Sequence, residues 1–128
     1  MDAIQDKDAV ALSSLATLVG GQPYLIQLAL YWLKSGAFSL GQILETASTN
    51  RGIYREYLWG LWVIIQREEK LAKTLHQILS TPDPIALTPE QANALVGTGL
   101  VKMVGHRGKL RCELYRSYFS ERLEVNGR

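Results

Sequence analysis

The sequence predicts a mainly α-helical protein with one β-hairpin near its end. From residue 8 to residue 96, apolar residues recur at steps of three and four, which is the spacing of amphipathic helices. Prolines and glycines divide this pattern into short segments. Alternation of apolar and polar residues, typical of strands, is confined to about residues 100–112. With 128 residues, 47% of them hydrophobic, the chain can bury a core of its own.

The first helix is expected over about residues 8–19, where Gly20-Gly21 stops the pattern. Residues 1–7 lack the apolar run of a secretory signal and are expected to be a disordered start or linker.

A second helix should begin at Pro23, because proline is tolerated in the first turn, and end at Gly36. Between Tyr24 and Leu33 only Gln27 is fully polar. We therefore expect the other helices to cover this helix on nearly every side. It is too short and too polar at Gln27 to span a bilayer, so no membrane segment is predicted.

Two further helices are expected before residue 68. Ser39 with Gln42 three residues later forms a capping box for a helix over about residues 39–47. A longer helix over about residues 52–67 has a core face of six residues: Tyr54, Tyr57, Leu58, Leu61, Trp62 and Ile65. Its opposite face carries the large apolar residues Trp59 and Val63, which we interpret as a docking surface.

The remaining helices are separated by strong helix breakers. A helix over residues 70–80 ends at the Thr81–Pro84 segment, whose two prolines cannot continue it. Thr88 and Gln91 form a second capping box, for a helix over residues 89–96. A hairpin follows, with strands over residues 100–104 and 110–112 and the four-residue loop Gly105-His106-Arg107-Gly108. The chain then continues with a helix over about residues 115–123 and a tail over 124–128.

The formal charge of +2 is unevenly distributed. Residues 1–99 hold seven basic and nine acidic side chains, whereas residues 100–128 hold seven basic and three acidic ones. Cys112 is the only cysteine, so no internal disulfide is possible and a cytoplasmic protein is expected.

No pattern of catalytic residues is present in the sequence. It has no GxxxxGK[ST] phosphate loop, no paired cysteine or histidine ligands and no GxSxG turn, so we predict no catalytic residue and no metal ligand. His76 and His106 are expected to be solvated. Cys112 is expected to be a small buried hydrophobe.

The order helix, helix, hairpin, helix is that of a winged-helix module, which makes nucleic acid a possible partner. The hairpin region offers four basic side chains to a phosphate backbone: Lys102, Arg107, Lys109 and Arg111. The preceding helix, which would enter a DNA groove, has no lysine or arginine, and this disfavours DNA binding.

Two stretches resemble a known family. Residues 20–30, Gly-Gly-Gln-Pro-Tyr-Leu-Ile-Gln-Leu-Ala-Leu, resemble the GG-x-P-Y-L-x-Q-L motif that follows the nucleotide-binding core of bacterial AAA-like P-loop ATPases, relatives of the STAND signalling ATPases. Residues 99–102 and 111–119 are similar to the hairpin and last helix of that family's winged-helix domain.

This resemblance implies a helical lid-like bundle over residues 8–49 and a degenerate winged helix over 50–123. It implies that Gly21, Gln22 and Pro23 face the adenine side of ATP or ADP, bound with Mg²⁺ in a full-length parent. Where relatives carry Met-His-Asp, with the histidine at the phosphate, this sequence has Arg111-Cys112-Glu113 and no histidine.

The leading hypothesis is a non-catalytic C-terminal region that closes over nucleotide and relays its state to a protein partner. The P-loop core would lie in the same polypeptide but outside these residues, so we expect this chain to hold no cofactor and to be no enzyme by itself. A DNA-binding regulator and a free-standing protein-interaction adaptor are the alternatives.

Overall fold

A computed structural model describes residues 6–123, so the predicted tail and most of the predicted start lie outside the described residues. The described part is mainly helical with one small antiparallel sheet, which confirms the predicted fold class. The elements in chain order are α1 (Asp6–Val19), α2 (Pro23–Ser35), α3 (Leu40–Thr46), α4 (Arg55–Arg67), α5 (Glu69–Leu79), β1 (Ile85–Ala86), α6 (Pro89–Thr98), β2 (Val101–Val104), β3 (Arg107–Leu110) and α7 (Glu113–Arg122).

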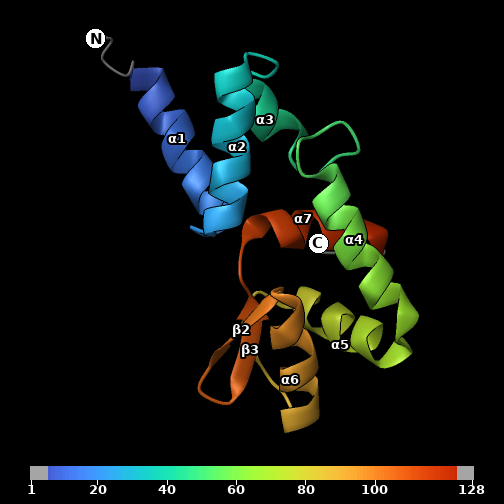
Figure 1. The fold of residues 1–128 in the computed structure, drawn as a ribbon. Coiled ribbons are helices and arrows are strands. Elements are labelled where there is room, and N and C mark those ends of the chain that lie inside the picture. Colours follow the sequence, from blue (N-terminus) through green and yellow to red (C-terminus); the bar gives the residue numbers. More distant parts are fainter. Residues whose placement is uncertain (1–5, 124–128) are drawn as a thin grey trace.

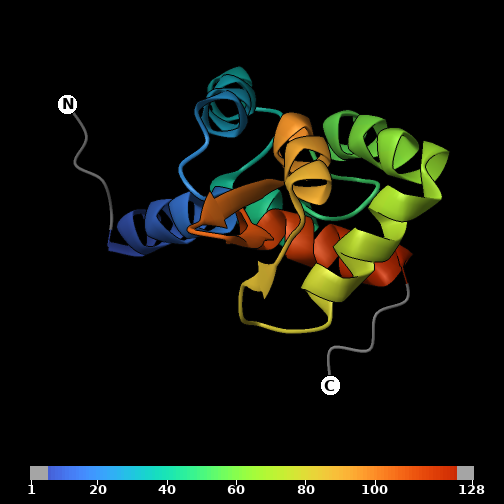
Figure 2. The ribbon, with the colours of Figure 1, turned by 90° about the horizontal axis from the view of Figure 1, so that it is seen from below.

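Helix α7 is the element that joins the two ends of the molecule. In Figure 1, α1, α2 and α3 lie at one end, α5, α6 and the sheet lie at the other, and α7 crosses between them. Figure 2 shows the same helix running through the middle of the structure. It packs against α1, α4, α5 and β3 and buries four side chains, those of Leu114, Tyr115, Tyr118 and Phe119. The buried core therefore runs continuously across residue 49, where the domain boundary is predicted.

Both predicted capping boxes are confirmed. In α3 the Ser39 N–H donates to Gln42 Oε1 at 2.8 Å and the Gln42 N–H donates to Ser39 Oγ at 3.1 Å. Thr88 and Gln91 make the same two bonds at the start of α6. Helix α6 continues to Thr98, two residues beyond its predicted end, because Gly99 adopts the left-handed conformation that ends it.

The predicted hairpin is present but its four-residue loop is wrong. Strands β2 and β3 are joined by the two residues Gly105-His106, and Gly105 has a φ of +65°, which suits a tight hairpin turn. Gly108, expected in the loop, is a strand residue that lies under Leu87, where a Cβ would collide with the leucine side chain.

A third strand was not predicted from the sequence. Strand β1 pairs with β3, placing Ile85 opposite Gly108, and gives the sheet order β1-β3-β2. Two residues are too few to show an alternating pattern.

The expectation that α2 is covered on nearly every side is also wrong. Only Leu25 and Ala29 of this helix are fully buried, while Tyr24, Leu30 and Tyr31 are exposed, Tyr31 to 64%. The helix packs against α1 at one edge of the molecule, which leaves its other side in solvent.

Helix α4 begins at Arg55, three residues later than predicted. Tyr54 lies in the preceding turn and is nevertheless fully buried. Its buried hydroxyl is satisfied by donating to the Leu25 carbonyl oxygen at 2.7 Å.

Candidate functional site

The glycine turn between α1 and α2 packs against the segment that joins β3 to α7. Gly20 and Gly21 have φ values of +62° and +71°. A Cβ on Gly20 would collide with the Arg111 carbonyl oxygen and lie 2.9 Å from Cys112 Cβ, whereas a Cβ on Gly21 would meet nothing within 4 Å. Glycine is therefore required at position 20 by both the positive φ and the close packing, and at position 21 by the positive φ alone.

A chain of hydrogen bonds runs from this turn into the core. Gln22 Nε2 donates to the Tyr115 hydroxyl at 3.1 Å, and that hydroxyl lies 2.8 Å from the Tyr57 hydroxyl. The turn is thereby linked to α7 and to α4. The Gln22 amide is directed inward, so Gly21 and Pro23 are the exposed residues of the predicted nucleotide-facing trio.

The groups beneath the turn are held in their neutral forms. Burial raises the pKa of the Tyr115 phenol far above its ordinary value, and the hydrogen bond with Tyr57 acts in the same direction. Burial also raises the pKa of the Cys112 thiol, although nearby backbone N–H groups and Gln22 lower it in part. Cys112 is buried, as predicted.

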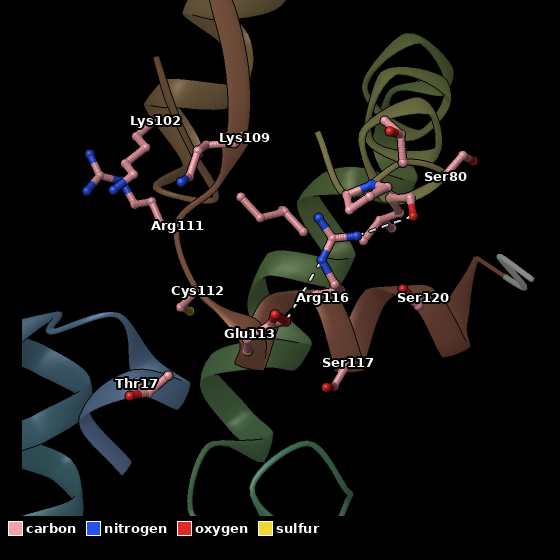
Figure 3. A pocket seen from close by; sticks show the side chains of 14 residues that line it. Thr17, Ser80, Lys102, Lys109, Arg111, Cys112, Glu113, Arg116, Ser117 and Ser120 are labelled. Carbon is pink, nitrogen blue, oxygen red and sulfur yellow. Dashed lines mark hydrogen bonds and ion pairs between the residues drawn. The ribbon is translucent and has the colours of Figure 1, made fainter. Parts of the chain in front are cut away.

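Beside this segment lies a cleft of about 810 Å³, open between the sheet, the α5–β1 connection and α7 (Figure 3). Of the four predicted nucleic-acid contacts, Lys102, Lys109 and Arg111 line it together. Arg107 does not; it lies at the far end of β3, where its Nη1 donates to the Pro84 carbonyl oxygen at 3.4 Å.

A fourth basic side chain in the cleft, Arg116 of α7, was not singled out from the sequence. Its Nη1 donates to the Leu79 carbonyl oxygen at 3.3 Å, and its Nε lies 3.8 Å from Glu113 Oε2. In Figure 3 Arg116 lies between Lys109 and Ser80. Only the Glu113 to Arg116 spacing is visible in the sequence, because the approach of α7 to the end of α5 depends on tertiary packing.

One family match includes the turn, the Arg111-Cys112 segment on which it packs, and all of the last helix except Arg122. A family model described as an AAA-like domain matches residues 2–121. The chain belongs to the AAA-like domain family. No curated protein and no solved structure matches this AAA-like domain significantly.

The predicted docking residues of the AAA-like domain lie one turn apart on α4. Trp59 is 52% exposed, and the Arg122 guanidinium carbon lies 5.6 Å from the centre of its ring, close enough for a cation–π contact. Val63 is half-buried. Trp59 is thus a surface residue and not part of the core.

The histidines of the AAA-like domain, His76 and His106, are both exposed, as predicted. Within residues 6–123 we find no group of three or more His, Cys, Asp or Glu side chains placed to hold a metal ion. None of the helices in the same part of the chain has the length and apolar character needed to cross a bilayer.

Proposed function

We propose that this AAA-like domain is a non-catalytic regulatory region that closes over a nucleotide and relays its state to a protein partner. The nucleotide would be held by a P-loop ATPase core in the same polypeptide, outside residues 1–128. The observation that supports this proposal is the attachment of the glycine turn to α7: Gly20 packs on Arg111-Cys112, and Gln22 bonds to Tyr115. A displacement of the turn would move α7, which packs on both ends of the molecule.

The exposed side of the turn is the surface that would lie against one face of an adenine ring. Gly21 and Pro23 are exposed, and Gly21 has open space around it, so a flat ring can approach the backbone closely. Gln22 would contribute only its backbone, because its amide holds Tyr115. When ATP or ADP with Mg²⁺ is bound, the metal and phosphate chemistry would belong to the P-loop core of the parent.

The surface of α4 around Trp59 and Val63 is proposed to dock on the P-loop core or on the protein partner. An exposed tryptophan is a common anchor of protein interfaces. The winged-helix assignment of residues 50–123, kinship with the bacterial STAND ATPases, a signalling role and a cytoplasmic location are parts of this same proposal.

Two measurements test the proposal: phosphate release from ATP by residues 1–128 alone, and nucleotide binding by the longer polypeptide that carries this region. Residues 1–128 alone should release no phosphate above background; robust hydrolysis by this chain would overturn the assignment. In the longer polypeptide that carries this region, Gly21→Ala should weaken nucleotide binding. Gly36→Ala is the matched control, since Gly36 also has a positive φ of 81°, is exposed and has open space around it. Equal effects of the two changes on nucleotide binding would mean that the turn does not face the nucleotide.

The alternative of a DNA-binding regulator is favoured by one observation, the shared exposed face of Lys102, Lys109 and Arg111 on the hairpin. Against it, α6 carries Glu90 and no basic residue. Fluorescence anisotropy with duplex DNA at two salt concentrations tests this alternative, because phosphate-driven binding must weaken steeply with salt. If the chain binds neither nucleotide nor DNA, the remaining hypothesis is a protein-interaction adaptor.

A further inference from the structure

We propose that the cleft between the sheet and α7 binds a small anion with two or more linked phosphate groups. We call it the cationic cleft and define it by its four basic residues, Lys102, Lys109, Arg111 and Arg116. Gly21 and Pro23 do not line this cleft, so the proposal does not depend on the function proposed for the turn.

The first argument is a pair of like charges that face each other across the hairpin. Lys102 and Lys109 are directly opposite in the register of β2 and β3, and both are exposed. Like charges in this position destabilise a hairpin. Within the described residues, the ion pairs are those of Lys73 with Glu69 and of Arg116 with Glu113, so neither Lys102 nor Lys109 has an acidic partner there. An anion between the two ammonium groups would convert their repulsion into two attractive contacts.

Arg111 extends the same charged face. It follows Lys109 by two residues, so both side chains are on one side of the strand. The Arg111 N–H donates to the Leu100 carbonyl oxygen at 2.9 Å, which continues the ladder between the strands and fixes the base of this side chain. Figure 3 shows Lys102, Lys109 and Arg111 close together at the sheet.

Arg116 faces the cleft from α7 and is already held in place. Its side chain is 31% exposed, and its contacts with the Leu79 carbonyl oxygen and with Glu113 restrict its rotation. A restrained guanidinium loses less entropy on binding a phosphate oxygen. Five hydroxyl side chains of the described residues also line the cleft: Thr17, Ser80, Thr81, Ser117 and Ser120. Ser80 Oγ already donates to the His76 carbonyl oxygen at 2.7 Å, and the other hydroxyls can donate to phosphate oxygens.

Charge and shape together indicate the class of ligand. A single phosphate group carries about two negative charges near neutral pH, whereas the described residues give the cleft four cations and one carboxylate, that of Glu113. Two linked phosphate groups match this charge better than one. The cleft volume of about 810 Å³ lies in the range of small-molecule sites. Thr17 of α1 and the Ser80–Pro82 segment also line the cleft, so it is a hollow between elements and not a projecting surface that would follow a duplex.

Isothermal titration calorimetry with pyrophosphate, in low salt and without divalent metal, tests the proposal. Lys109→Gln and Arg111→Gln should each weaken binding by about tenfold or more, the effect of one charge-assisted contact. The matched control is Arg107→Gln, which removes the same charge from the same strand but outside the cleft, and it should change the affinity less than twofold. Absence of pyrophosphate binding, or an equal loss in Arg107→Gln, would overturn the proposal.

Loss of pyrophosphate binding in a variant could also result from unfolding, whereas a gain in affinity could not, so a variant that should bind more tightly is also needed. Glu113→Gln removes the carboxylate charge that lines the cleft among the described residues but keeps a side-chain oxygen beside Arg116 Nε, so Arg116 stays restrained and pyrophosphate affinity should increase several-fold. Thermal unfolding of each variant shows whether it is folded. Weaker binding by folded Glu113→Gln would contradict the proposed charge balance and overturn the site.

Competition experiments distinguish the sources of the phosphate groups. Pyrophosphate should bind more tightly than inorganic phosphate. Displacement of pyrophosphate by ATP assigns the site to the phosphates of a nucleotide, and failure of ATP to displace it assigns the site to a free oligophosphate; both outcomes support the ligand class. If duplex DNA instead binds more tightly than pyrophosphate and depends on Arg107 as strongly as on Lys109, the surface is a nucleic-acid interface and the proposal is wrong.

Discussion

The side-chain amide of Gln22 donates a hydrogen bond to the hydroxyl of Tyr115 at 3.1 Å, joining two segments that are 93 residues apart in the sequence. Gln22 precedes α2 and Tyr115 belongs to the first turn of α7. The same hydroxyl lies 2.8 Å from that of Tyr57, so one oxygen connects three elements.

Removing this oxygen should destabilise the protein. Tyr115→Phe leaves the Gln22 amide and the Tyr57 hydroxyl without their shared partner, at a cost of about 1–2 kcal/mol in the free energy of unfolding. Urea denaturation measures this cost. In a double-mutant cycle, Gln22→Leu with Tyr115→Phe should cost less than the sum of the two single changes, because one interaction is lost only once. Strictly additive costs would show that the bond does not contribute.

The two glycines of the turn should differ in their tolerance of a side chain. In Gly21→Ala the added methyl group meets no other atom, so the cost is that of holding an alanine at a positive φ, about 1 kcal/mol. Gly20→Ala adds a collision with the backbone of Arg111 and should cost about 3 kcal/mol or more, since a carbonyl of the main chain cannot easily move aside. Denaturation midpoints of the two variants make the comparison. A similar loss in both would mean that the turn is not packed against the Arg111-Cys112 segment.

The sequence was sufficient for the features that depend on neighbouring residues. Both capping boxes, at Ser39 and at Thr88, depend on contacts within four residues, and the structure has them where the sequence predicts them. The same holds for the end of α5 before Pro82 and Pro84. Because glycine favours turns, the sequence predicts a loop at Gly108. In the structure Gly108 is a strand residue under Leu87, a contact that no local pattern reveals.

The parts of the candidate site that were missed depend on tertiary packing. The sequence groups Lys102, Arg107, Lys109 and Arg111 in the hairpin region, and the structure brings all of these but Arg107 together in the cleft. Arg116 could not be added to them, because its position in the cleft depends on how α7 meets the end of α5. The exposure of Tyr31 was missed for the same reason: composition shows that a helix is apolar, but not whether enough neighbours exist to cover it.

Replacement of Trp59 should have little effect on folding. Trp59→Glu removes an exposed ring and its cation–π contact with Arg122, and should cost less than about 1 kcal/mol. The neighbouring core residue Leu58 is the control, since it is fully buried and Leu58→Ala should cost about 2–5 kcal/mol. Urea denaturation of both variants measures these costs. If Trp59→Glu costs as much as Leu58→Ala, Trp59 is a core residue and the surface around it is not available for docking.

Stability should fall steeply in alkaline solution, because buried groups must stay neutral in the folded state. Burial raises the pKa of Tyr54 and of Tyr115 well above the ordinary value of 10.0, and that of Cys112 above 9.0. Well below their ordinary pKa values these groups are protonated in both the folded and the unfolded chain, so their contribution to stability is fully present. Above their ordinary pKa values the unfolded chain releases protons that the folded chain retains, and stability is lost as the pH rises towards the folded-state values.

Each such phenol lowers the free energy of unfolding by about 1.4 kcal/mol per pH unit above pH 10. Urea denaturation at pH 8 and at pH 11 should therefore show a loss of at least about 2 kcal/mol. Tyr54→Phe should be less stable than the parent at pH 8, because its bond to the Leu25 carbonyl oxygen is gone, yet should lose about 1 kcal/mol less between the two pH values. An identical pH dependence in Tyr54→Phe and the parent would mean that this phenol ionises as readily in the folded chain as in the unfolded one, which contradicts its buried position.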